Sequence, residues 1–272
     1  MQEMVAEYSG THEVLLNRNE RNLGIGGHVN RLMELAKGEL IVGAAGDDIS
    51  LPERTYKTVN VWKSEDNVHS IYSLIRCIDE DGCECGFLDN PYQDSFNEPY
   101  FFVNNMFWVT GSSHAWSRDI FSFFGNINDD VVNEDMVIPF RSLLIGKIKY
   151  INDPLVKYRL NVGISSEKIK KNDTRIKEIP LKQSTRKIAV LKQYLSDLSK
   201  VNFHNHKLVI TLVEKKIMQQ LITIEFIENR GNLWLLMKGM VNKISWLYLL
   251  KTYLKHKLPK SFILLNYRIK GL

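Results

Sequence analysis

The first 38 residues pass through segments with different hydrophobic patterns. Residues 1–8 are expected to end a helix, 12–18 (HEVLLNR) predict a strand, and 22–27 (NLGIGG) predict a glycine-rich turn. Residues 28–38 predict a helix that Gly38 ends, because glycine is common just past the end of a helix. The apolar positions that give this segment its helical spacing are Val29, Leu32, Met33 and Ala36.

The next segments, from residue 39 to residue 89, add further strands and a second helix. An apolar strand at 39–45 narrows to glycine and alanine, and a helix is expected at 51–64 with Pro52 near its first turn. Residues 68–89 predict two strands that are joined by a turn at Asp81 and Gly82. Strands and helices that alternate with short connections indicate an α/β fold with parallel strands covered by helices.

The rest of the pattern divides into a mixed part and a helical part. Residues 90–105 predict a long aromatic loop, and 107–125 predict a strand, a bend of small residues and a helix. A helix at 133–146 and strand material at 147–160 follow. After residue 166 the chain is rich in Lys and Leu at helical spacing, which predicts an α-helical C-terminal extension over 167–272.

The charge distribution changes at the same boundary. Residues 1–166 contain 14 Lys and Arg against 24 Asp and Glu, a net charge of −10, whereas 167–272 contain 22 against 7, a net charge of +15. Such asymmetry suggests two parts with different partners. The basic part fits either a solvated helical cap or an interfacial helix at 233–254 on an anionic membrane surface. Nucleic acid is not expected as a partner, because no recognition motif is present.

Composition and cysteine content point to a cytoplasmic protein with a sizeable core. The chain has 272 residues, of which 44% are hydrophobic, and no signal peptide or membrane-spanning segment is predicted. Three cysteines, Cys77, Cys83 and Cys85, argue against a disulfide framework and fit a reducing compartment. They also lack a fourth ligand at the spacing of a zinc site, so free cysteines in a hairpin are the preferred interpretation.

Two adjacent carboxylates, Asp47 and Asp48, follow the strand at 39–45. In a parallel α/β sheet, ligands bind beyond the carboxyl ends of the strands, and the small residues 43–46 let another group approach the backbone. Paired carboxylates repel each other unless a cation lies between them, and Mg²⁺ or Mn²⁺ prefers such hard oxygen ligands. The alternative is a simple turn in which Asp48 caps the following helix.

The segment around these acids resembles the core of the GT-A fold, family 2 glycosyltransferases. The residues that match the family pattern are Asn22, Gly24, Asn30, Ala36, Gly38, Glu39, Asp47, Asp48 and Pro52. The similarity extends to GSSHAWSRDIFSFFG, NEDMVIPFRSLLIG and DPLVKYRLNVGISS, so that it covers 1–166. It implies a Rossmann-like, mostly parallel sheet with helices on both faces, and an inverting, hexosyltransferase-type enzyme that uses a nucleotide-sugar donor.

The resemblance also implies roles for particular residues. Asp48 and Asp47 are expected to hold a divalent metal (Mg²⁺ or Mn²⁺) and to bind the donor. Asp135 is the first choice for the base that accepts the proton of the acceptor hydroxyl, and Glu134 is the second. Without the resemblance, both acids would simply favour a helix N-terminus. Three further residues are expected to bind the donor: Asn30, Arg21 and Arg159.

The same comparison suggests a place in the cell and a competing function. The family acts on sugar or lipid-linked acceptors, which fits assembly of a cell-surface polysaccharide or glycolipid and a peripheral position on the inner face of the membrane. The family's first strands, which hold the nucleotide base, have no counterpart in this sequence, so the domain is expected to be short at its N-terminus. A misassigned start, a true truncation or a second chain that supplies the strands would each explain this. The alternative is a catalytically inactive remnant that binds a membrane or a partner protein.

Overall fold

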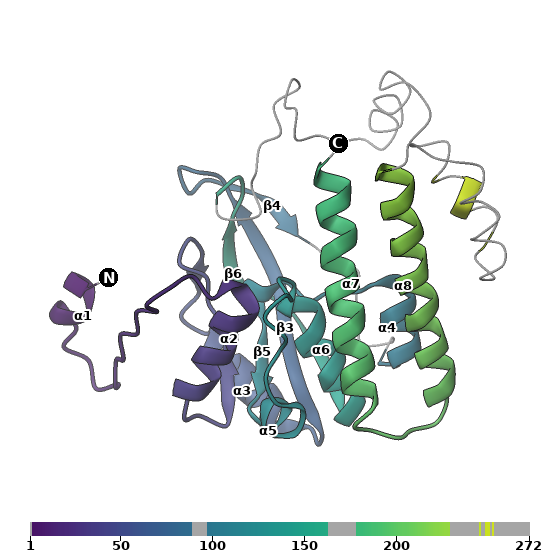
Figure 1. Ribbon diagram of the computed structural model, residues 1–272. Helices are drawn as coiled ribbons and strands as arrows, with labels where there is room; N and C mark the ends of the chain where they lie inside the picture. The colour runs from purple at the N-terminus through teal and green to yellow at the C-terminus, as the bar shows by residue number, and fades with distance from the viewer. Residues whose placement is uncertain are drawn as a thin grey trace.

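The computed structural model describes residues 2–88, 97–162 and 178–228, together with 245, 248–250 and 252 (Figure 1). The interfacial helix expected at 233–254 and the first part of the loop expected at 90–105 therefore lie largely outside the described residues. Among the helices in the described ranges, none has the length and apolar content that crossing a membrane requires.

The core of the fold is a six-stranded sheet in the order β1-β5-β3-β6-β2, with β4 paired to the end of β3. The bounds of the strands are β1 Leu40–Val42, β2 Ile49–Ser50, β3 Val68–Ile78, β4 Glu84–Leu88, β5 Ala115–Ser117 and β6 Lys147–Arg159. The two long strands β3 and β6 run parallel to each other, whereas the other described pairs are antiparallel. The α/β class is confirmed, and the sheet is mixed: its longest strand pair, β3 with β6, is parallel as expected, whereas the shorter pairs are antiparallel.

The hairpin of β3 and β4 forms as its sequence predicts. β3 is buried along nearly its whole length, as expected for a central strand. Its apolar residues are interrupted only by His69, Ser70, Ser73 and Arg76. The turn is closed by the carboxylate of Asp79, which accepts the backbone N–H groups of Asp81 and Cys83, and Gly82 adopts a φ of 90°. Because a hairpin reverses the chain directly, β4 has to pair antiparallel with β3.

The N-terminal segments differ from their predictions in three places. Residues 12–18 form no strand, because no strand in the described residues offers them backbone hydrogen bonds, and Leu15 stays 61% exposed. The glycine-rich segment is mostly helical: α2 begins at Gly24, and a Cβ on Gly26 would lie 2.6 Å from the carbonyl oxygen of Val131. The same helix ends at Leu35 with Ala36 in an extended conformation, so Gly38 does not end it.

The helices pack against the sheet and against one another. Their bounds are α1 Gln2–Glu7, α2 Gly24–Leu35, α3 Arg54–Ser64, α4 Pro99–Asn105, α5 Asp119–Phe124, α6 Glu134–Ile145, α7 Glu178–Leu198 and α8 His206–Glu228. In Figure 1, α1 stands apart from the rest, whereas α7 and α8 run side by side, with α7 against α6 and α8 against α4. One hydrophobic core includes side chains from α2, α6, α7 and α8, so the helical part predicted beyond residue 166 shares its core with the sheet.

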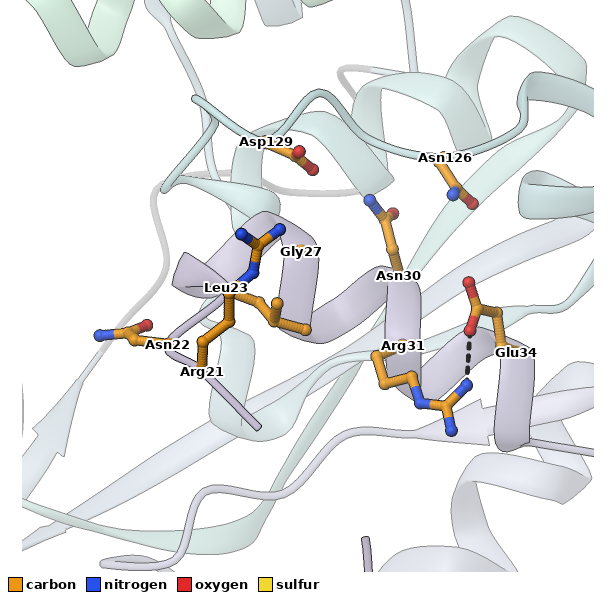
Figure 2. Close-up of a pocket in the computed structure, with 9 residues that line it drawn as sticks. All are labelled: Arg21, Asn22, Leu23, Gly27, Asn30, Arg31, Glu34, Asn126 and Asp129. Atoms are coloured by element: carbon orange, nitrogen blue, oxygen red, sulfur yellow. Dashed lines mark hydrogen bonds and ion pairs between the residues drawn. The ribbon is translucent and has the colours of Figure 1, made fainter. Parts of the chain in front are cut away.

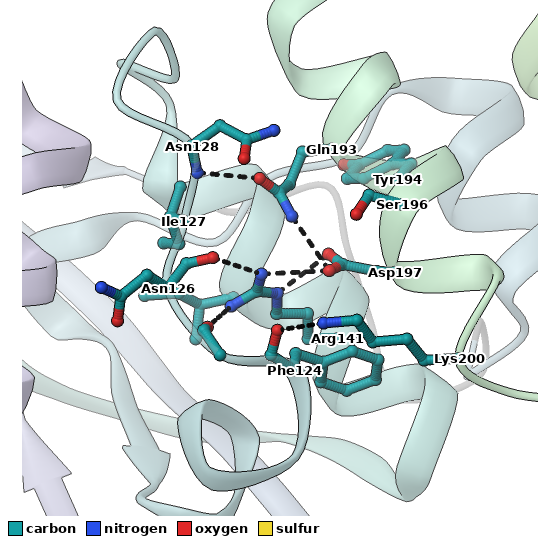
Figure 3. A network of polar contacts seen from close by, with 12 residues as sticks. Phe124, Asn126, Ile127, Asn128, Arg141, Gln193, Tyr194, Ser196, Asp197 and Lys200 are labelled. Carbon is teal, nitrogen blue, oxygen red and sulfur yellow. Dashed lines mark hydrogen bonds and ion pairs between the residues drawn. The ribbon is translucent and has the colours of Figure 1, made fainter.

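A buried polar network joins α6 to α7 inside this core (Figure 3). Arg141 of α6 is fully buried, and its Nε and Nη2 atoms donate to the two carboxylate oxygens of Asp197 at 2.8 and 3.0 Å. The same guanidinium donates to the carbonyl oxygens of Gly125 and Asn126, and Gln193 accepts the backbone N–H of Asn128 at 2.9 Å. Helix α7 therefore fixes both α6 and the loop that follows α5.

Candidate active site

The two glycines between β1 and the paired acids have different surroundings. Gly43 follows β1, and a Cβ at this position would lie 3.0 Å from the ring of Trp116 and 3.3 Å from the carbonyl oxygen of His114. The close approach that Gly43 permits is therefore made by the protein's own side chain. Around Gly46 the space is open, because a Cβ there would meet no atom within 4 Å. Of these two positions, only Gly46, next to the acids, leaves room for a ligand.

Asp48 is held in one orientation and keeps one oxygen free of hydrogen bonds. Its Oδ1 accepts the backbone N–H of Arg159 at 2.9 Å, whereas its buried Oδ2 has no hydrogen-bond partner within the described residues. Burial raises the pKa of Asp48, and the bond from Arg159 opposes this rise. The half-buried Asp47 next to it raises the pKa of Asp48 further through its charge. A cation beside Oδ2 would relieve this repulsion.

The guanidinium of Arg159 fastens the turn that carries both acids. Its Nη1 donates to the carbonyl oxygens of Asp79 and Glu80 at 3.0 and 2.9 Å, and its Nε donates to that of Asp47 at 3.2 Å. The end of β6 thus ties the Asp47–Asp48 turn to the β3–β4 hairpin. The predicted contact of Arg159 with a donor diphosphate stays a prediction.

A short 3₁₀ turn, η2 (Gly111–Ser113), brings the two sets of acids together. Ser112 lies close enough to Asp48 to lower the pKa of that carboxyl. On the other side of the turn, a Cβ on Gly111 would lie 3.4 Å from Oε1 of Glu134, and the backbone N–H of Val109 donates to the carbonyl oxygen of Asp135 at 3.0 Å. Asp48 and Glu134, which are 86 positions apart in the chain, therefore lie against neighbouring residues of the same turn.

Glu134 and Asp135 lie in the first turn of α6 and are partly buried. Burial, and then the charge of Glu134, raise the pKa of Asp135 from its ordinary value of 3.8 to about 7. Burial also raises the pKa of Glu134, although backbone N–H groups at the start of the helix stabilise its charge. The helix terminus alone would lower both pKa values. A carboxyl with a pKa near neutrality suits general acid–base catalysis better than one that only caps a helix.

Arg54 is a component of the site that sequence analysis missed. It is 3% exposed, begins α3, and donates to the carbonyl oxygen of Gly43 and to the hydroxyl of Ser50 at 2.6 and 2.8 Å. Burial lowers the pKa of Arg54 to about 10, and the negative charge of Asp48 opposes this shift. A cation in the first turn of a helix is unfavourable next to the helix dipole, so an arginine at the predicted start of this helix was a sign in the sequence that Arg54 has another role.

His114 occupies the core behind the site. It is fully buried, and its Nε2 pairs with the hydroxyl of Ser70 at 2.8 Å. Burial, and then the charge of Arg54, lower the pKa of His114 to about 3, so that its ring is neutral at physiological pH. This environment favours a structural role for His114.

Two of the predicted donor-binding residues, Asn30 and Arg21, lie at a different place. The amide of Asn30 is 6% exposed, donates to the carbonyl oxygen of Ile127 at 2.7 Å and accepts the N–H of Ile127 at 2.8 Å. Arg21 lines a cavity of about 510 Å³ between the start of α2 and the loop after α5 (Figure 2). The residues that line this cavity are Arg21, Asn22, Leu23, Gly27, Asn30, Arg31, Glu34, Asn126 and Asp129. None of them belongs to the group around Asp48 and Asp135.

The residues beside Asp48 fit a divalent cation whose other ligands are mostly water and phosphate oxygens. Mg²⁺ is commonly held by one or two carboxylates together with substrate phosphates. Asp48 offers one unpaired carboxylate oxygen, and Asp47 is the residue directly before it in the chain. Within the described part of the chain, no group of three or more His, Cys, Asp or Glu side chains forms a site made by protein ligands alone.

Comparison with known proteins supports a glycosyltransferase relationship in part of the chain. The chain is 32% identical over 82 residues to an uncharacterised glycosyltransferase of Methanocaldococcus jannaschii, and the match covers 30% of this chain and 28% of that protein. A solved mannosyltransferase of Pyrobaculum calidifontis, in complex with GDP-Man and Mn²⁺, aligns with 90% of this chain and 68% of its own, with 16% identity and a TM-score of 0.41. No protein-family model matches the chain.

Proposed function

We propose that the chain is a metal-dependent, inverting glycosyltransferase of the GT-A fold, family 2 type. The observation that carries this proposal is the placement of two partly buried acid sites on the two sides of η2. One is Asp48, with an unpaired oxygen beside open space, and the other is Asp135, with a pKa near neutrality. The partial identity to a glycosyltransferase supports the same reaction class. A catalytically inactive remnant would have no need of this second, buried acid.

The two acid sites divide the chemistry of sugar transfer between them. Asp48, with Asp47, would hold Mg²⁺ or Mn²⁺, and the bound cation supplies positive charge to the departing nucleoside diphosphate. Asp135 accepts the proton of the acceptor hydroxyl as that oxygen bonds to the anomeric carbon. The bond from the anomeric carbon to the diphosphate breaks, and the diphosphate leaves with the electron pair. Attack opposite the leaving group inverts the anomeric centre.

The burial of Asp135 prepares it for this role. Below a pH of about 7 Asp135 holds its proton and cannot act as a base. Above that pH it is a poorly solvated carboxylate that can accept a proton. Glu134 raises the pKa of Asp135 by its charge and stands as the second candidate for the base. We extend the proposal to a nucleotide-sugar donor and a sugar or lipid-linked acceptor used in cell-surface polysaccharide or glycolipid assembly, at the cytoplasmic face of the membrane.

Donor binding tests the proposal, and Asp48→Asn is the variant that decides it. We expect the parent to bind at least one nucleotide sugar from a panel of UDP-, GDP- and dTDP-sugars in the presence of Mn²⁺, measured by isothermal titration calorimetry. Asp48→Asn should weaken that binding at least 10-fold, since it removes the charge beside the diphosphate site.

The control is Asp153→Asn, which removes a carboxylate from an exposed ion pair with Lys57 and should leave the affinity unchanged. A loss of affinity in Asp129→Asn, with Asp48→Asn unaffected, would place the donor in the cavity beside α2. No binding of any donor by the parent would contradict the proposal.

A further inference from the structure

The 3₁₀ turn η2 carries a buried hydroxyl that has no hydrogen-bond partner. Ser112 is 8% exposed, and its Oγ is one of six buried side-chain atoms without a partner in the described ranges. Another is Oδ2 of Asp48, the acid that lies beside Ser112. Buried polar atoms in native proteins are normally paired, so two neighbouring unpaired oxygens indicate a ligand that completes them.

The neighbouring serine shows that Ser112 is not needed to hold the turn. The hydroxyl of Ser113 donates to the carbonyl oxygen of Thr110 at 3.2 Å and accepts the backbone N–H of Ser73 at 3.5 Å. The backbone N–H groups of Ser113 and His114 close the turn on Thr110 and Gly111. These contacts fix the conformation of η2 without the side chain of Ser112. That side chain therefore remains available for a ligand.

Ser112 and Asp48 lie side by side, but their oxygens do not pair with each other. Ser112 is near enough to lower the pKa of Asp48, yet neither its Oγ nor the Oδ2 of Asp48 meets the geometry of a hydrogen bond. A shared cation satisfies both oxygens, because hard divalent cations bind carboxylate and hydroxyl oxygens alike. A Ser or Thr hydroxyl plays this part for Mg²⁺ in phosphate-binding loops.

We infer that the Ser112 hydroxyl is an oxygen ligand of the divalent cation that Asp48 holds. This inference rests on the proposed function and adds a ligand from the acceptor side of the site. Because a Cβ on Gly111, the residue before Ser112, would lie 3.4 Å from Oε1 of Glu134, the turn sets the position of the cation relative to the first turn of α6. Ser112 would then align the diphosphate end of the donor with the base, in addition to binding metal.

Metal binding tests this inference without any measurement of sugar transfer. We expect Mn²⁺ to bind the parent, with affinity measured from the electron paramagnetic resonance signal of free Mn²⁺, alone and with inorganic pyrophosphate. Ser112→Ala should weaken this affinity about 10-fold or more, a loss of the size found when groups around a metal are removed. The matched control, Ser113→Ala on the same turn, should bind Mn²⁺ as the parent does.

A thiol at the same position separates direct ligation from an indirect effect. Ser112→Cys should bind Mn²⁺ poorly but gain affinity for Cd²⁺ relative to the parent, because sulfur prefers softer cations. Parent-like Mn²⁺ affinity in Ser112→Ala, with Asp48→Asn impaired, would overturn the role of Ser112 and leave the proposed function intact. No Mn²⁺ binding by the parent, even with pyrophosphate, would overturn both. Equal melting temperatures of parent and Ser112→Ala would show that folding does not explain the result.

Discussion

Replacement of Asp135 by Asn is expected to stabilise the folded protein at neutral and alkaline pH. In the folded state burial raises the pKa of Asp135 to about 7, whereas the unfolded chain has the ordinary value of 3.8. Below pH 3.8 both states are protonated and the acid changes nothing. As the pH rises from 4 to 7, the unfolded state loses its proton first, so the stability of the parent falls, and above pH 7 the full penalty remains.

Asparagine resembles the protonated acid and does not pay this penalty. The gap between 3.8 and about 7 corresponds to roughly 4 kcal/mol, and we expect a gain of about that order above pH 7 and almost none at pH 4. Urea unfolding of the parent and of Asp135→Asn at pH 4.5, 6 and 8 measures it. Asp153→Asn, on an exposed carboxylate, is the control. An equal or lower stability of Asp135→Asn at pH 8 would show that the charge of Asp135 does not destabilise the folded state.

Loss of Arg141 is expected to destabilise the protein more than any surface substitution. Arg141→Met leaves the carboxylate of Asp197 buried without the two hydrogen bonds that the guanidinium donates. Breaking a buried ion pair by removing one partner costs roughly 3–5 kcal/mol. The double variant Arg141→Met with Asp197→Leu removes both charges and should recover much of the loss. Chemical denaturation of the two single variants and the double variant measures the coupling.

The effect of Arg141 should extend to the candidate site, because α7 supports the start of α6. The hydroxyl of Tyr194 in α7 donates to the carbonyl oxygen of Met136 at 3.1 Å, one residue beyond Asp135. Arg31→Met serves as a control, since it breaks only the exposed pair of Arg31 with Glu34, and such pairs contribute about 1 kcal/mol or less. If Arg141→Met and Arg31→Met lost equal stability, the network of Figure 3 would not hold the fold together.

Local sequence signals predicted those elements that depend on nearby residues. The β3–β4 hairpin follows from two segments of strand-forming residues with Asp and Gly at the turn between them, and α6 follows from acids before an apolar helical pattern. The long helices α7 and α8 follow from helical spacing in the basic part. The prediction of a strand at 12–18 is wrong because a strand needs a neighbouring strand to pair with, and a local sequence pattern does not show whether one is present.

Only those residues of the candidate site that match the family motifs were predictable from the sequence. Asp47, Asp48, Glu134 and Asp135 were identified through an ordered set of motifs, and their placement on the two sides of η2 needed the fold. Ser112 and Arg54 carried no local signal strong enough to mark them, because the importance of both comes from burial, and Ser112 has no hydrogen-bond partner among the described residues. The assignment of Asn30 shows the converse, since its amide pairs with a backbone 97 residues away.

Sugar transfer by the parent and by Asp135→Asn tests the central claim most directly. Release of nucleoside diphosphate from the nucleotide-sugar panel is followed with Mn²⁺ and a set of sugar and polyprenyl-phosphate acceptors, between pH 5 and 9. The rate for the parent should rise with pH through an apparent pKa of about 7, the value that burial gives Asp135. Asp135→Asn should lower that rate by about 100-fold or more while donor binding persists. Transfer by Asp135→Asn at the parent's rate, or no release from any donor by the parent, would contradict the account.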